Sequence, residues 1–200
     1  MVNNYEDVDL MLLKRWGEVK ALRSAFDDLM DRMHEMIEAT LGKITHAAAE
    51  RGMSCDSDPK YPSIWFWKKE WEIRSSKEPG IYFLLSCFAP AEYGKVADHR
   101  PEMWLMCEDF SRLKFRESGE EFAQLVRASL SPELVTKWSH EDADLSGSPL
   151  GKECSEVPDS DRVHMVTEPD ALNKFVIERL DEFMELVPAI DQALQKMTRR

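Results

Sequence analysis

Three of the six tryptophans in this 200-residue chain lie within seven residues, inside the run IWFWKKEWEIR at positions 64–74. Successive side chains of a β-strand point to opposite faces, so a two-residue period divides this run into two sets. One set is apolar and comprises Trp65, Trp67, Trp71 and Ile73. The other is charged and comprises Lys68, Glu70, Glu72 and Arg74. The run therefore predicts a strand with one aromatic face, which requires a sheet in a chain whose ends have helical spacing.

The N-terminal quarter of the chain has the apolar spacing of one long amphipathic helix, which we expect over residues 9–51. Apolar side chains recur there every three or four residues. The stripe comprises Val19, Leu22, Phe26, Leu29, Met33 and Met36, and then steps to Ile37, Leu41, Ile44 and Ala48. Gly52 follows as a C-terminal cap. Such a stripe usually packs into the core of its own chain, and a homodimer through the same seam is the alternative.

The middle and the C-terminal end of the chain complete the predicted fold. The run 81–88 is almost entirely apolar, which is typical of a central strand covered on both faces. Further strands are expected at 103–107 and 113–115, and a short helix at 119–130. A final amphipathic helix begins near Glu168, with a kink expected at Pro188. These elements predict an α+β fold, with an antiparallel sheet of four to five strands packed against long N-terminal and C-terminal amphipathic helices.

Two segments lack a periodic pattern. Residues 54–62 form a polar connection with two prolines, and residues 139–162 are acidic and rich in turn formers. We expect the second segment to be a long acidic loop, followed by a short strand at 163–166. The sequence leaves open whether that loop is ordered or disordered. The length suits a single α+β domain over residues 1–200.

Composition excludes several classes of function. A net charge of −12 argues against a protein that binds nucleic acid by general attraction to phosphate. The chain has no run of eighteen apolar residues that would span a membrane, and its first residues lack the pattern of a secretory signal. The four cysteines form no CxxC pair. We therefore expect a cytoplasmic protein of bacterial or phage origin, with no membrane contact.

Motifs for catalysis and metal binding are sparse. The sequence has no Gly-x-Ser-x-Gly elbow, phosphate-binding glycine loop or dinucleotide fingerprint. His34 and Glu38 stand one helical turn apart, but a helical metal site needs a second such pair, and the final helix has no histidine. We therefore predict no metal site and no cofactor.

The order helix, hairpin, strand, helix, strand is similar to the core of PD-(D/E)XK nuclease-like proteins. That resemblance implies an acidic residue on one strand and a Glu-x-Lys motif on the next, which hold Mg²⁺ and activate water. The nearest match comprises Asp58, Glu70, Glu72 and Arg74, with arginine in the place of lysine. The alternative function is therefore a metal-dependent, nuclease-like enzyme, either intact or degenerate.

The leading hypothesis is a non-enzymatic binding or regulatory protein that engages another protein, such as an immunity, inhibitor or accessory factor. It rests on the lack of a coherent catalytic motif, the segregation of charge along the chain and the aromatic run. Large aromatic and cationic side chains are frequent hot spots of protein interfaces. Lys68, Lys69 and Trp71 are the predicted binding residues. Neither the partner nor the oligomeric state follows from the sequence.

Overall fold

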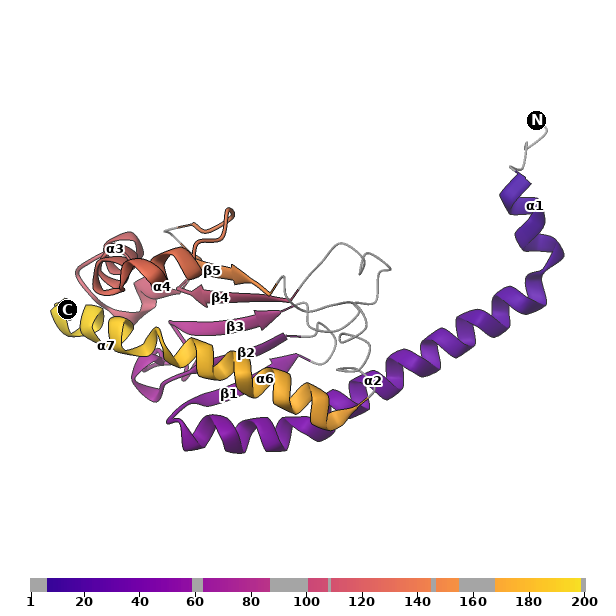
Figure 1. The fold of residues 1–200 in the computed structure, drawn as a ribbon, viewed down its shortest axis with the longest axis horizontal. Helices are drawn as coiled ribbons and strands as arrows, with labels where there is room; N and C mark the ends of the chain where they lie inside the picture. The colour runs from indigo at the N-terminus through magenta and orange to yellow at the C-terminus, as the bar shows by residue number, and fades with distance from the viewer. Residues whose placement is uncertain are drawn as a thin grey trace.

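A five-stranded antiparallel sheet organises the molecule, and its strands follow one another in chain order (Figure 1). The strands are β1 (Ser54–Asp58), β2 (Ser63–Trp67), β3 (Tyr82–Ser86), β4 (Glu102–Met106) and β5 (Leu150–Glu153). The helices are α1 (Asp7–Lys14), α2 (Trp16–Glu50), α3 (Gly119–Ser129), α4 (Pro132–Lys137), α6 (Pro169–Met184) and α7 (Val187–Lys196). This computed structural model describes residues 7–58, 63–86, 101–107, 109–144, 147–154 and 168–198. The predicted α+β fold with an antiparallel sheet is confirmed.

The core lies between one face of the sheet and the helices. Every second side chain of β2, β3 and β4 is buried there, and the set comprises Ile64, Phe66, Phe83, Leu85, Met103 and Leu105. Phe183 of α6 packs onto this face, with its ring stacked on Phe83 at 4.6 Å between centroids. The rings of Phe66 and Trp138 also lie near the Phe183 ring, with 6.2 and 5.5 Å between ring centroids. Burial of such large aromatic side chains dominates the stability of a core of this size.

The tryptophan run does not form the single strand that its alternation predicts. Strand β2 ends at Trp67, and a short 3-10 helix occupies Lys69–Trp71. Within β2 the buried side chains are Ile64 and Phe66, so Trp65 and Trp67 lie half-buried on the opposite face of the sheet. The 3-10 turn resets the alternation, because the Trp71 backbone N–H donates to the Lys68 carbonyl at 2.9 Å. Trp71 and Ile73 then point into the core, and the predicted single aromatic face is wrong.

Two strands lie where the sequence predicts none. Strand β1 occupies part of the predicted polar connection, and its sequence SCDSD has low intrinsic preference for a strand. It forms by pairing with β2 in the register Ser54↔Trp67 to Asp58↔Ser63. Strand β5 lies inside the predicted acidic loop, where Gly151 leaves room for the ring of Trp104 on β4. Tertiary pairing therefore decides both strands.

Three further sequence predictions differ from the structure or fall outside it. The predicted strand at 113–115 is replaced by a 3-10 helix, Phe110–Leu113, and the residues that follow it. Strand β3, predicted to be covered on both faces, is fully buried on one face and half-buried on the other. The predicted strand at 163–166 lies outside the described residues.

The helix ends follow signals in the sequence, but the single helix predicted over residues 9–51 is divided at Arg15 into α1 and α2. Gly52 has a φ of +71° and closes α2, with the Met53 backbone N–H donating to the Ala48 carbonyl at 2.9 Å. The final helix divides into α6 and α7 immediately before Pro188, as its missing N–H requires. The C-terminal half of α2 packs against α6 and β1. Ion pairs from Lys43 to Asp170 and from Arg51 to Asp181 hold α2 to α6, at 3.1 and 2.6 Å.

In the part of the chain that the structure describes, no helix is both long enough and apolar enough to cross a membrane.

Candidate functional site

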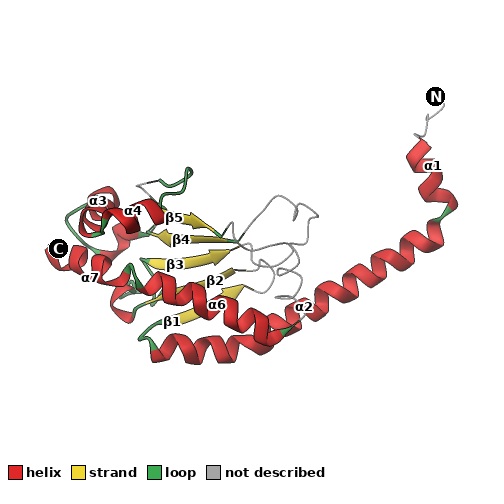
Figure 2. Cartoon of the chain, in the orientation of Figure 1, coloured by secondary structure: helices red, strands yellow, loops and turns green. Residues whose placement is uncertain are grey.

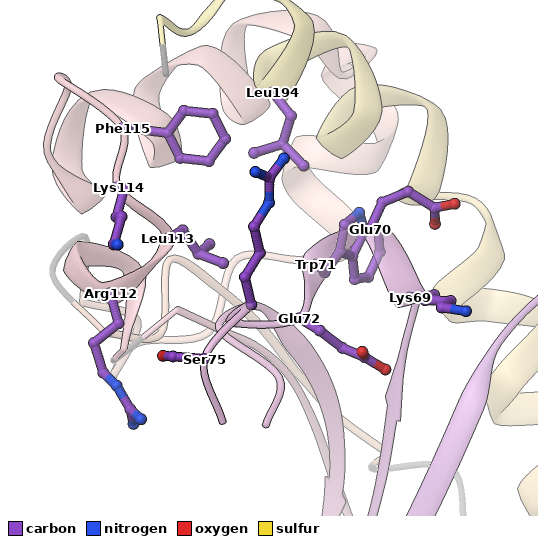
Figure 3. A pocket seen from close by; sticks show the side chains of 11 residues that line it. Lys69, Glu70, Trp71, Glu72, Ser75, Arg112, Leu113, Lys114, Phe115 and Leu194 are labelled. Atoms are coloured by element: carbon purple, nitrogen blue, oxygen red, sulfur yellow. The ribbon is translucent and has the colours of Figure 1, made fainter. Parts of the chain in front are cut away.

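Most of the residues predicted for a site border one cleft of about 620 Å³ (Figure 3). The segment Lys69–Ser75 forms one wall, and the segment Arg112–Phe115 forms the wall opposite. Figure 3 shows Glu70 and Glu72 on one side of the cleft, and Arg112 and Lys114 on the other. The floor is apolar and comprises Trp71, Leu113, Phe115 and Leu194. The cleft therefore combines an apolar base with a charged rim.

The rim carries more cations than acids. Lys69, Arg74, Arg112 and Lys114 outnumber Glu70 and Glu72. Arg112 is held in place, because its guanidinium contacts Glu78 at 3.0 Å and Asp109 at 3.3 Å. Hydrogen bonding to Ser76, together with the hydrogen bond and charge of Arg112, lowers the pKa of the Glu78 carboxyl below its ordinary value. Lys114 adopts the left-handed conformation, with a φ of 61°, at the end of its 3-10 helix.

The predicted binding residues have separate roles. The Lys68 ammonium group contacts the Asp191 carboxylate of α7 at 2.7 Å. Trp71 is completely buried, and its indole N–H donates to the same carboxylate at 3.3 Å. Both side chains therefore anchor α7 to the segment that follows β2, and Trp71 offers no exposed ring to a partner. Lys69 is exposed on the rim of the cleft.

The predicted nuclease-like set is not assembled. Asp58 ends β1 opposite Ser63 at the start of β2, whereas Glu70 and Glu72 come after Trp67 at the other end of that strand. Four residues of extended chain, at about 3.3 Å each, separate the two ends of β2 by roughly 13 Å. Glu72 instead accepts a hydrogen bond from the Trp67 indole N–H at 3.2 Å. Among the described residues, no three histidine, cysteine or acidic side chains gather in a way that could hold a metal ion.

A second candidate surface lies outside the body of the protein, on the N-terminal helices. Helix α1 and the first part of α2 extend away from the sheet, and no other described element lies beside them (Figure 2). We call residues 9–35 the arm. Every side chain that the structure describes in the arm is exposed, apart from half-buried Val19. Among the described residues, the connection between the arm and the body runs through the continuation of α2 (Figure 1).

The arm exposes large apolar side chains in quantity. They are Leu10, Met11, Leu12, Leu13, Trp16, Leu22, Phe26 and Leu29. Leu22 is 74% exposed and Phe26 is 45% exposed, whereas Thr40 and Ile44, further along the same helix, are each 1% exposed. Soluble monomers rarely leave a contiguous apolar surface of this extent in water. Among the described side chains, the apolar stripe that predicts a helix packed in its own core joins the core cluster only from Met36 onward.

Sequence reasoning finds some of these features and misses others. It identifies Glu70, Glu72 and Arg74, which border the cleft, because they belong to the conspicuous tryptophan run. It misses Arg112 and Lys114, because about forty residues separate them from that run and no local pattern marks them. It finds the stripe of the arm from its helical period, but periodicity does not distinguish a core from an interface.

Compared with known proteins, the chain matches no family model, no curated protein and no solved structure.

Proposed function

We propose that this chain is a non-enzymatic, cytoplasmic binding or regulatory protein that acts through contacts of its arm with another protein chain. The observation that carries the proposal is the apolar surface of the arm, on which eight large hydrophobic side chains are exposed, three of them (Leu22, Phe26 and Leu29) in the stripe of α2. The body needs none of them for its own core, because its buried cluster is complete without any residue before Met36 among those described.

The length of the arm strengthens the proposal. The arm comprises most of α1 and the first part of α2, and no other described element lies beside it (Figure 1). Helices without tertiary packing gain little from intrinsic propensity alone, since most helical stability in proteins comes from packing of an apolar face. Glycine at position 17 lowers that propensity further, by about 1 kcal/mol relative to alanine. A partner that covers the stripe supplies the missing packing. This is the arrangement by which an amphipathic helix serves as a recognition element.

Site-specific photocrosslinking tests this proposal. A photoreactive phenylalanine analogue at position 22 replaces the most exposed apolar side chain of the arm, at 74% exposure. The same analogue at position 24 replaces Ser24, which lies on the opposite, polar side of the helix. We expect illumination of cells that make the chain to give protein adducts from position 22 and few from position 24. Absence of any adduct at position 22, or equal labelling at both positions, contradicts the proposal.

The nuclease-like alternative has less support from the geometry. Only Glu70, Glu72 and Arg74 border the cleft, and Asp58 lies at the far end of β1. The observation in its favour is that an acidic pair and cationic side chains border the same cleft (Figure 3). Its decisive test is DNA or RNA cleavage that depends on Mg²⁺ or Mn²⁺ and is abolished by Glu72→Ala.

A further inference from the structure

We infer that the chain covering the arm is a second copy of this protein, paired with it in the antiparallel direction. The inference rests on the proposed function and names the partner. It concerns the seam, which we define as six heptad-spaced apolar positions of α2. The seam begins four residues after Arg15, where α1 and α2 divide, and ends at Met36, which also packs against the body. The seam comprises Val19, Leu22, Phe26, Leu29, Met33 and Met36.

The spacing of the seam is self-complementary under a two-fold axis. In an antiparallel pair centred between Asp27 and Asp28, Val19 lies at the level of Met36 of the second copy. By the same symmetry Leu22 lies opposite Met33, and Phe26 lies opposite Leu29. All six positions then find an apolar partner, which gives six continuous layers with none left over. Two-fold interfaces require this reciprocity, in which each residue contacts a partner that contacts it in return.

The charges along the arm favour the antiparallel direction. Residues 14–23 carry four cations and one acid, and residues 27–38 carry five acids and one arginine. An antiparallel pair in this register places residues 14–23 of each helix at the level of residues 32–41 of the other, which carry two acids, Glu35 and Glu38, and one cation, Arg32. A parallel pair places like charges together at both ends, which is destabilising in a helix pair. The charge pattern thus favours the antiparallel over the parallel direction.

The position of the body leads to the same direction. Thr40, Ile44 and Ala47 continue the three-and-four spacing of the seam and are buried against the body, where α2 packs on α6 and β1. Two parallel helices would remain side by side beyond Met36, in space that each body already fills. In the antiparallel pair, each α2 instead reaches the body of the second copy at its Val19. Four residues toward the N-terminus, about 6 Å along the helix axis, α2 ends at the break at Arg15 that separates it from α1.

Sedimentation equilibrium tests the second copy as the partner. The wild-type chain is expected to have twice the monomer mass of 23.2 kDa at concentrations from about 1 to about 100 μM. Leu22→Asp is expected to weaken the dimer at least about 100-fold, because each dimer loses two buried leucines. Ser24→Asp adds the same charge on the outer side of the helix and is expected to leave the dimer intact. Circular dichroism and thermal unfolding check that the body of each variant remains folded.

Disulfide pairing tests the direction. Val19→Cys and Met36→Cys chains, distinguished by a tag on one of them, are mixed and oxidised. The antiparallel pair predicts a mixed disulfide, and little disulfide within either chain type alone, since two copies of position 19 lie roughly 26 Å apart. The wild-type chain, which keeps its four native cysteines, serves as the background.

The outcomes separate this inference from the proposed function. A wild-type chain that stays at 23.2 kDa overturns the second copy as partner, while adducts of another mass from position 22 would still support the proposed function. A dimer unaffected by Leu22→Asp places the interface elsewhere and overturns the claim that the seam pairs with the seam of a second copy. A Val19→Cys chain that forms its own disulfide dimer overturns the antiparallel direction.

Discussion

Replacement of Phe183 by alanine is expected to lower the free energy of unfolding by about 4 kcal/mol, the middle of the range for aromatic truncation in a core. The ring is fully buried at the centre of the sheet face, where it contacts Phe66, Phe83 and Trp138. Its loss removes the packing between α6 and the strands and leaves a cavity. Urea unfolding followed by tryptophan fluorescence measures the effect.

The matched substitution in the arm, Phe26→Ala, is expected to change the free energy of unfolding by less than about 0.5 kcal/mol. Phe26 is 45% exposed and touches no part of the body's core cluster. Both substitutions are best compared in the Leu22→Asp background, so that any loss of association is common to the two chains. A similar loss from Phe26→Ala and Phe183→Ala would mean that the arm packs on its own body.

The second large effect is expected at Glu182 of α6, which binds three cations. Its carboxylate contacts Lys152 at 2.6 Å, Arg179 at 3.0 Å and Lys137 at 3.3 Å. The Glu182 side chain is only 16% exposed, so its loss leaves cationic groups short of a partner in a weakly solvated place. Glu182→Gln is expected to lower the free energy of unfolding by about 2 kcal/mol at neutral pH. Glu178→Gln on the same helix is the control, and its half-exposed pairs predict less than about 0.5 kcal/mol.

The pH dependence of this effect follows from the pKa of Glu182. Burial favours the neutral acid, but the hydrogen bond from Lys152 and the charges of Arg179, Lys152 and Lys137 outweigh burial and lower the pKa below 4.5. Since the folded-state pKa is depressed, the stabilisation is fully present above the unfolded-state pKa and is lost as pH falls through the folded-state pKa. The difference between wild type and Glu182→Gln should therefore stay constant from pH 7 to about pH 5 and shrink below about pH 4.5. A difference that persists unchanged in acid contradicts this account.

The sequence predicts the helices and the centre of the sheet because their signals are local. The three-and-four spacing that predicts α2 and the kink at Pro188 both depend on neighbouring residues, and both are found. The run 81–88 predicts β3 for the same reason, and β3 does lie at the middle of the sheet. Strand β1 is different, because its polar sequence becomes a strand only when β2 lies beside it.

The candidate site is predictable only in part, because some of its residues are distant from one another in the sequence. Glu70, Glu72 and Arg74 border the cleft as neighbours in sequence, but the 3-10 turn at Lys69–Trp71 changes which side chains face the core. Alternation alone does not reveal that turn. The opposite wall, around Arg112, comes from a distant segment that the sheet brings near. The stripe of α2 is likewise uniform in sequence, although one part is covered by the body and the other is not.

Hydrogen exchange of the backbone amides of residues 19–36 tests most directly the claim that a second copy covers the arm. A solvated helix without packing is marginal and exchanges rapidly, whereas a covered helix is protected. We expect slow exchange in the concentrated wild-type chain and in Ser24→Asp, and rapid exchange over the same residues in Leu22→Asp, with the body unchanged in all three. Rapid exchange of residues 19–36 in the wild-type chain at every concentration, equal to that of Leu22→Asp, would contradict the claim.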